Sequence, residues 1–183
     1  MNLRRVLFLL ALLFTPAIAS AQVGIYGQFN AVHASTSGTN LYESTGWFVG
    51  PTAGVYYDFL HLGPVGIGAD LRGSYLFQSP QKYRSILFGL RLAVKPPVLP
   101  LRPYIQGSVG VGGSTRSGLG GNGVLYNNKF QYQVVGGIDY TLVPHLDWRV
   151  AELGYGRSAG ISSGGPTPGV NLFTISTGVV FRF

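Results

Sequence analysis

The sequence contains no cysteine, so the fold of this 183-residue chain has no disulfide bonds. It also has little charge: Asp, Glu, Lys and Arg make up 10% of the residues, against about a quarter in soluble domains. After the first twenty or so residues, no stretch supplies the eighteen consecutive apolar residues of a transmembrane helix. The composition therefore fits neither an ordinary soluble domain nor a helical membrane protein.

Strong charge clusters are missing as well. Lys and Arg outnumber Asp and Glu by 13 to 6, but no run of like charges and no basic stripe interleaved with aromatic residues occurs. We therefore expect no nucleic-acid partner.

The first residues have the features of a secretory signal peptide. Arg4 and Arg5 precede an apolar segment, residues 6–14, that is too short to span a bilayer, and Ala19-Ser20-Ala21 forms a small-residue cleavage motif. We expect residues 1–21 to be removed and residues 22–183 to form a single exported domain.

Alternation of apolar with small or polar residues dominates the rest of the chain, which is rich in glycine and aromatic residues. A period of two is typical of β-strands. Short turns at 61–64, 96–102 and 143–145 alternate with Gly/Ser-rich loops at 34–45, 78–82, 114–128 and 157–169. The pattern predicts an all-β fold, an eight-stranded antiparallel up-and-down barrel with both termini at the short-turn end. The expected strands are 23–34, 46–59, 65–77, 83–95, 103–113, 129–142, 146–156 and 171–183.

The size of the alternating side chains indicates which face meets lipid. The polar set is dominated by Gly, Ser, Thr, Gln, Asp and Arg, which cannot fill an interior as an apolar core. The other set is large and apolar, with aromatic residues near the strand ends, as in the two girdles of a transmembrane barrel. The predicted loop-end girdle is Trp47, Tyr75, Phe77, Phe130, Tyr132 and Phe173, and the turn-end girdle is Tyr57, Phe59, Tyr140, Trp148, Phe181 and Phe183.

Charged residues on the polar faces are expected to point into the lumen. Folding a hairpin about Pro144 sets Asp139 opposite Arg149, which predicts a cross-strand ion pair. Arg149 and Glu152 have opposite parity, so both point inward only if a β-bulge adds one residue. The predicted lumen charges are Asp70, Arg72, Arg91, Asp139, Arg149 and Glu152.

The signal peptide, the eight alternating segments and the terminal "GVVFRF" resemble the small outer-membrane barrels of the OmpA type. The resemblance implies a monomer in a bacterial outer membrane, with periplasmic termini and lipid and lipopolysaccharide around it. It also implies that the barrel-insertion machinery reads the last strand, through Phe183, Phe181, Val179 and Ile175. The peptidoglycan-binding domain of some relatives is not expected here.

A structural or surface-interaction role through four extracellular loops is the function expected from this resemblance, with no enzyme activity. A narrow, low-conductance channel is the first alternative. A lipid-modifying enzyme is the second, because His33 and Ser35 share a strand face and Glu43 follows in the same loop. We expect no cofactor or metal: His61 and His145 lack ligand spacing, and the Gly-rich stretch 110–123 lacks the lysine of a phosphate-binding loop. Arg116 and Arg157 are candidates for contact with lipopolysaccharide phosphates.

Overall fold

The computed structural model describes residues 22–36, 46–79, 81–96, 98–117, 124–160 and 167–183. The predicted signal peptide lies outside these described residues. Among them, no helix is long and apolar enough to cross a membrane. The described chain forms eight strands: β1 (Gln22–Thr36), β2 (Gly46–Leu62), β3 (Val65–Gln78), β4 (Gln81–Val94), β5 (Leu101–Ser117), β6 (Val124–Val143), β7 (Leu146–Gly160) and β8 (Thr167–Arg182).

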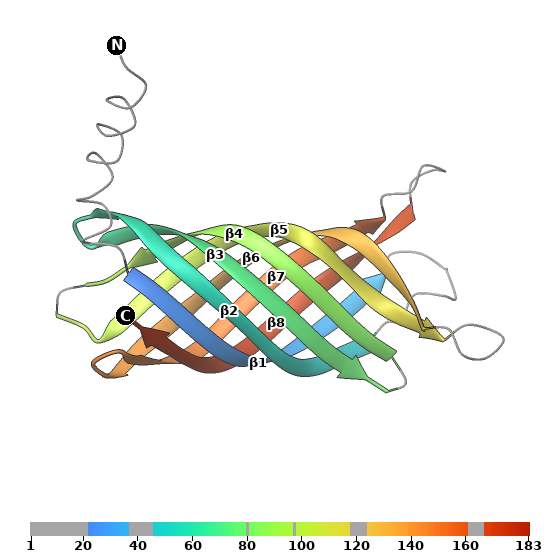
Figure 1. The fold of residues 1–183 in the computed structure, drawn as a ribbon, viewed down its shortest axis with the longest axis horizontal. Helices are drawn as coiled ribbons and strands as arrows, with labels where there is room; N and C mark the ends of the chain where they lie inside the picture. Colours follow the sequence, from blue (N-terminus) through green and yellow to red (C-terminus); the bar gives the residue numbers. More distant parts are fainter. Residues whose placement is uncertain (1–21, 37–45, 80, 97, 118–123, 161–166) are drawn as a thin grey trace, which may run out of the picture.

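The strands close into a barrel in which each pairs antiparallel with the next along the chain. β1 completes the ring by pairing with β8, from Gly24 opposite Arg182 to Thr36 opposite Val170. Figure 1 shows the start of β1 and the C-terminus at the same end of the barrel. The predicted barrel is confirmed, and its closure rests on this pairing of the first and last strands. A closed ring leaves no strand edge with unpaired backbone groups.

The end of the barrel that holds the start of β1 and the C-terminus is called the turn end below. Two tight turns at this end each contain a residue in the left-handed backbone conformation. Gly63 (φ 61°) connects β2 to β3, and His145 (φ 72°) connects β6 to β7. A left-handed conformation is costly for a residue with a side chain. At His145 it is held by two contacts with β8: Nδ1 donates to the Arg182 carbonyl, and the His145 carbonyl accepts from the Arg182 N–H, each at 2.9 Å.

At the opposite end, called the loop end below, several predicted boundaries are wrong. The expected loop 78–82 is a turn, because β3 ends at Gln78 and β4 begins at Gln81. The expected loop 114–128 is largely a hairpin, in which β5 and β6 stay in register as far as Ser117 opposite Val124. The Ser, Thr, Gly and Asn content of these segments favours loops, but the continued β ladder keeps them extended. At the turn end, Leu101 and Arg102 belong to β5 and not to the predicted turn 96–102.

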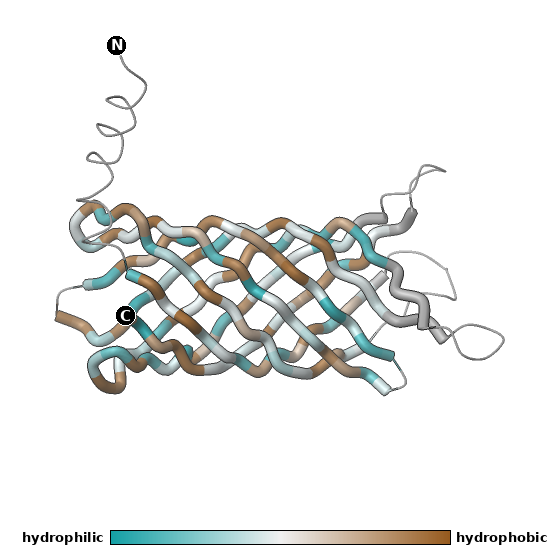
Figure 2. The backbone as a smooth tube through the Cα atoms, in the orientation of Figure 1, coloured by the Kyte–Doolittle hydropathy of each residue, from teal (hydrophilic) through white to brown (hydrophobic). Residues whose placement is uncertain are grey.

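The outer surface of the barrel is apolar. Ile86 and Leu90 of β4, for example, are 62% and 61% exposed, and Figure 2 shows hydrophobic residues recurring along the strands. Trp47 and Tyr57, from the two predicted girdles, both face outward on β2, ten residues apart. At about 3.3 Å per residue and a tilt of about 40°, they stand about 25 Å apart along the barrel axis, the height of the apolar band of a membrane barrel.

The predicted bulge lies in β7. Ile138 pairs with Ala151 whereas Asp139 pairs with Arg149, so Val150 is an extra residue relative to β6. Val150 and Ala151 both face outward, and the residues on either side of them, Arg149 and Glu152, are both buried inside the barrel. The bulge thus gives these two charges the same direction despite their opposite parity.

Candidate functional site

The six predicted lumen charges form one cluster inside the barrel, called the central network below. Arg149 pairs with Asp139 at 2.9 Å, as predicted, and Arg91 contacts the same carboxylate at 2.8 Å. Arg72 lies 2.9 Å from Glu152 and 3.2 Å from Asp70. Glu152 also lies 3.5 Å from Arg149. Three guanidinium groups therefore balance three carboxylates, which is how buried charges are tolerated. The members are Asp70, Arg72, Arg91, Asp139, Arg149 and Glu152, all at most 3% exposed.

Three tyrosines pack between these charges. The guanidinium of Arg91 lies 4.1 Å from the ring centroids of both Tyr56 and Tyr104, and that of Arg149 lies 4.4 Å from the Tyr26 ring. The Tyr26 hydroxyl donates to Asp70 at 2.8 Å. These cation–π contacts and hydrogen bonds fill the lumen with planar groups and leave the central network little freedom.

The tyrosines have room because glycine faces them on the neighbouring strand. Gly24 is opposite Tyr56, Gly54 is opposite Tyr26, and Gly137 is opposite Tyr104. A Cβ atom at Gly137 would lie 2.6 Å from the Tyr104 ring. The sequence interpretation did not predict this aromatic filling. The sequence contained the information needed to predict it, because each tyrosine occupies one of the alternate positions of its strand that face inward.

Two further ion pairs lie at the turn end of the lumen. Arg102 contacts Asp58 at 2.7 Å, and Arg182 contacts Asp147 at 2.5 Å. Neither pair was predicted. The alternation could have predicted that three of these residues face the lumen. Asp58, Asp147 and Arg182 each lie an even number of positions from other inward-facing residues of the same strand. Arg102 was missed because it was assigned to a turn.

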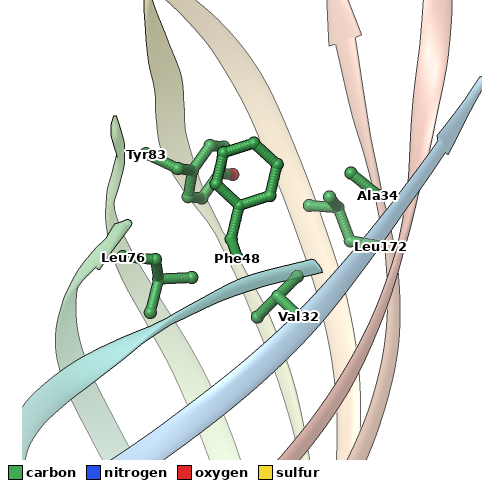
Figure 3. Packing of buried hydrophobic residues seen from close by; sticks show 6 residues of the cluster. All are labelled: Val32, Ala34, Phe48, Leu76, Tyr83 and Leu172. Carbon is green, nitrogen blue, oxygen red and sulfur yellow. The ribbon is translucent and has the colours of Figure 1, made fainter. Parts of the chain in front are cut away.

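Toward the loop end, the lumen holds an apolar cluster, called the seal below. Figure 3 shows Phe48, Leu76 and Leu172 pointing into the barrel interior from different strands. The Phe48 and Tyr83 rings lie 6.0 Å apart. The seal corrects the expectation that the inward set holds no apolar filling. Its members are Val32, Ala34, Phe48, Leu76, Tyr83 and Leu172, all at most 9% exposed.

A ladder of amide and hydroxyl groups links the central network to the seal. Gln28 donates to both Glu152 and Asn30. Asn30 donates to Thr52 at 2.8 Å, and Thr52 donates to Ser74 at 2.7 Å. Going from the turn end to the loop end, the lumen therefore holds ion pairs, the central network, hydrogen-bonded polar groups and the apolar seal.

The lumen holds almost all the acidic residues of the chain. The sequence has six Asp and Glu, and five of them are paired with lumen arginines, the sixth being Glu43, which lies outside the described residues. After Gln22, six cationic residues are not in these pairs. One of them, Lys95, follows β4 at the turn end, and five lie toward the loop end: Lys82, Arg84, Arg116, Lys129 and Arg157.

The catalytic alternative gains no support from the described residues. His33 lies on the outward face of β1 beside Trp47, with ring centroids 5.0 Å apart, and Ser35 is opposite Asn171 of β8. Glu43 lies outside the described residues. In the described part of the chain, no group of three His, Cys, Asp or Glu residues is placed to hold a metal ion.

The predicted assembly signal and girdles occupy the outer surface. Phe183, Phe181, Val179 and Ile175 all point outward on or just after β8, with Phe183 71% exposed. Their reading by an insertion machinery stays a prediction. The remaining predicted girdle residues are also exposed on the strands, but Phe29 and Phe88 place aromatic rings at mid-strand too. The exposed girdle positions are Trp47, Tyr57, Phe59, Tyr75, Phe77, Phe130, Tyr132, Tyr140, Trp148, Phe173 and Phe181.

Comparisons with known proteins give the fold. No protein-family model matches the sequence, and no curated protein matches it. Among solved structures, the barrel is similar to Neisserial surface protein A (NspA), with a TM-score of 0.58 and 18% identity over 88% of this chain and 97% of that one. It is also similar to Ail, the attachment invasion locus protein of Yersinia pestis, with a TM-score of 0.58 and 14% identity over 89% and 99%.

The same architecture also carries an enzyme. The outer membrane enzyme PagL matches with a TM-score of 0.50 and 11% identity, over 82% of this chain and 97% of that one. The chain therefore has the fold of small eight-stranded outer-membrane barrels. A fold shared by surface proteins and an enzyme does not assign a role, which has to come from the side chains.

Proposed function

We propose that this protein is an integral barrel of a bacterial outer membrane, without enzymatic activity, that makes contact with polyanionic sugars through its loop end. The membrane location is supported by the apolar outer surface, where side chains such as Phe88 and Ile105 are more than half exposed. Such a continuous apolar surface is unfavourable in water and favourable in lipid.

A transport role is disfavoured by the filling of the lumen. The central network, the tyrosines and the seal occupy successive levels of the interior, and their side chains are buried. Moving a charged group out of the central network would leave its partner unpaired at low dielectric, which is strongly unfavourable. The lumen thus has the character of a core rather than a pore.

The distribution of charge carries the proposal for the loop end. Five cationic residues lie toward the loop end, whereas five of the six acidic residues of the chain are paired with arginines inside the lumen. Arg84 and Arg157 face outward there and are exposed. Guanidinium groups suit phosphate and sulfate geometry. Ail, which shares this fold, has been solved in complex with the heparin analogue sucrose octasulfate, which supports a polyanion as the partner class.

Binding of sucrose octasulfate and of purified lipopolysaccharide to the protein in detergent micelles tests the proposal. Replacing Arg84 and Arg157 together by Gln should weaken binding about 25-fold at low salt, since each cation contributes about 1 kcal/mol toward an anionic surface. The affinity of the unchanged protein should also fall steeply as salt is raised.

Lys95→Gln is the matched control, because it removes one positive charge at the opposite end of the barrel and should leave affinity unchanged. Equal affinity of the double variant and the unchanged protein would contradict the proposal. Hydrolysis of lipopolysaccharide acyl chains that is lost in His33→Ala would contradict its non-enzymatic part.

A further inference from the structure

The turn end of the barrel contains a pocket of about 410 Å³ under the connection from β4 to β5. Lys95 and Pro96 line it from the beginning of this connection, and Val98 and Leu99 from its middle. Arg102, Thr141 and Arg182 line it from the mouth of the lumen. The pocket thus combines a polar wall with an apolar one.

Every charged residue lining this pocket is cationic. Arg102 and Arg182 are 3% and 6% exposed, and the carboxylates that pair with them, Asp58 and Asp147, are not part of the lining. Each guanidinium also keeps a buried Nε without a hydrogen-bond partner. In the central network, Arg91 likewise keeps its Nε and Nη1 without a partner, whereas the Nε of Arg149 donates to Asp139 at 2.9 Å. Both arginines of the turn end line the pocket together with Lys95, so an anionic group that enters it meets three cationic residues.

The pocket also connects the lumen to the outer surface. Leu101, which faces outward, and Arg102, which faces inward, are neighbours in β5 and both line it. Val98 and Leu99 are 87% and 57% exposed beside the cations. A ligand that fits this arrangement has an anionic group next to an apolar chain. Free phosphate would use only the cationic wall.

We propose that this pocket binds the phosphate headgroup of an anionic phospholipid in the leaflet at the turn end of the barrel. The phosphate lies among Lys95, Arg102 and Arg182, with the Thr141 hydroxyl as a further donor, and the acyl chains run along Leu99 and Leu101. This inference rests on the membrane location proposed above. It gives the barrel a lipid held at one end and a sugar contact at the other.

Native mass spectrometry of the folded protein in detergent, titrated with phosphatidylglycerol or phosphatidylcholine, tests this site. One phosphatidylglycerol should be retained at concentrations where phosphatidylcholine is not. Lys95→Gln should weaken retention about fivefold, the effect of losing one cation near an anionic headgroup. Val98→Asp, an exposed position, should weaken it further by placing a negative charge beside the phosphate. The double change of Arg84 and Arg157 to Gln is the control and should have no effect.

Several outcomes would overturn the inference: equal retention of both lipids, no effect of Lys95→Gln, or displacement of the lipid by millimolar inorganic phosphate, which would identify a free-anion site. Heat-dependent gel mobility of each variant shows whether the barrel is folded. Insertion of the protein into lipid vesicles is measured separately. An inserted barrel that retains no phosphatidylglycerol contradicts the pocket alone, whereas a chain that does not insert contradicts the membrane location.

Discussion

Thr177 is the single polar residue in the outward-facing series of β8 from Phe173 to Phe183, and its contacts explain it. Its hydroxyl donates to the Arg149 carbonyl at 2.9 Å and accepts from the Trp148 indole N–H at 3.2 Å. Arg149 lies at the bulge, where the regular ladder between β7 and β8 is interrupted. In lipid no water can satisfy such a carbonyl, so the threonine hydroxyl takes that role.

Thr177→Val should therefore destabilise the barrel by about 1–3 kcal/mol, because it keeps the shape of the side chain but leaves a carbonyl and an indole N–H unsatisfied. The measurement is the free energy of unfolding by urea in lipid vesicles. Thr177→Ser keeps the hydroxyl and should cost less. A valine variant as stable as the unchanged protein would show that these bonds do not matter.

At the residue scale, the alternation along each strand predicted well whether a side chain points into the lumen or outward. It predicted poorly which other side chains that residue contacts. Asp139 and Arg149 were found together because one hairpin joins them. Arg72 and Glu152 come from strands far apart in the sequence, and only the curvature of the closed barrel brings them to 2.9 Å. The tyrosine filling was missed for a related reason: an inward aromatic ring is accommodated by a glycine on the next strand, and strand register is not visible in a single segment.

At the element scale, the bulge in β7 decides whether two charges can share the lumen. Deleting Val150 removes the extra residue, so either Arg149 or Glu152 has to face lipid. The cost is that of a charge on the lipid face, about 2–4 kcal/mol for arginine, together with the unpaired partner left inside. We expect the deletion variant to fail to fold into vesicles.

Val150→Ala keeps the residue count and serves as the control, with folding close to that of the unchanged protein. Heat-dependent gel mobility after refolding distinguishes the two variants. Normal folding of the deletion variant would mean that the bulge is not needed to direct Arg149 and Glu152 inward.

The existence of each strand was predictable from alternation alone. The strand ends were not, because cross-strand pairing extends β5 and β6 through residues whose composition favours loops.

At the scale of the whole molecule, the filled lumen predicts that the protein does not conduct ions. In planar bilayers the unchanged protein should show no sizeable current steps. Phe48→Ala with Leu172→Ala removes much of the seal, but the central network still blocks the lumen, so this variant should stay closed as well. Current steps in the unchanged protein that change on replacing Arg91 or Arg149 would support the channel alternative instead.

The ring of strands has one seam that differs from all the others. Seven of the eight strand pairs join neighbours along the chain, and only β1 with β8 joins its two ends. Hairpins can thus form early and locally, while the seam closes a loop of nearly the whole chain and comes late. Gln28 of β1 bonds Glu152 and Arg149 of β7 across that seam. Until β1 pairs with β8, the Glu152 carboxylate and the Arg149 guanidinium lack the Gln28 amide as a hydrogen-bond partner. A barrel that closes in the wrong register leaves these buried charged groups without that partner and is therefore less stable.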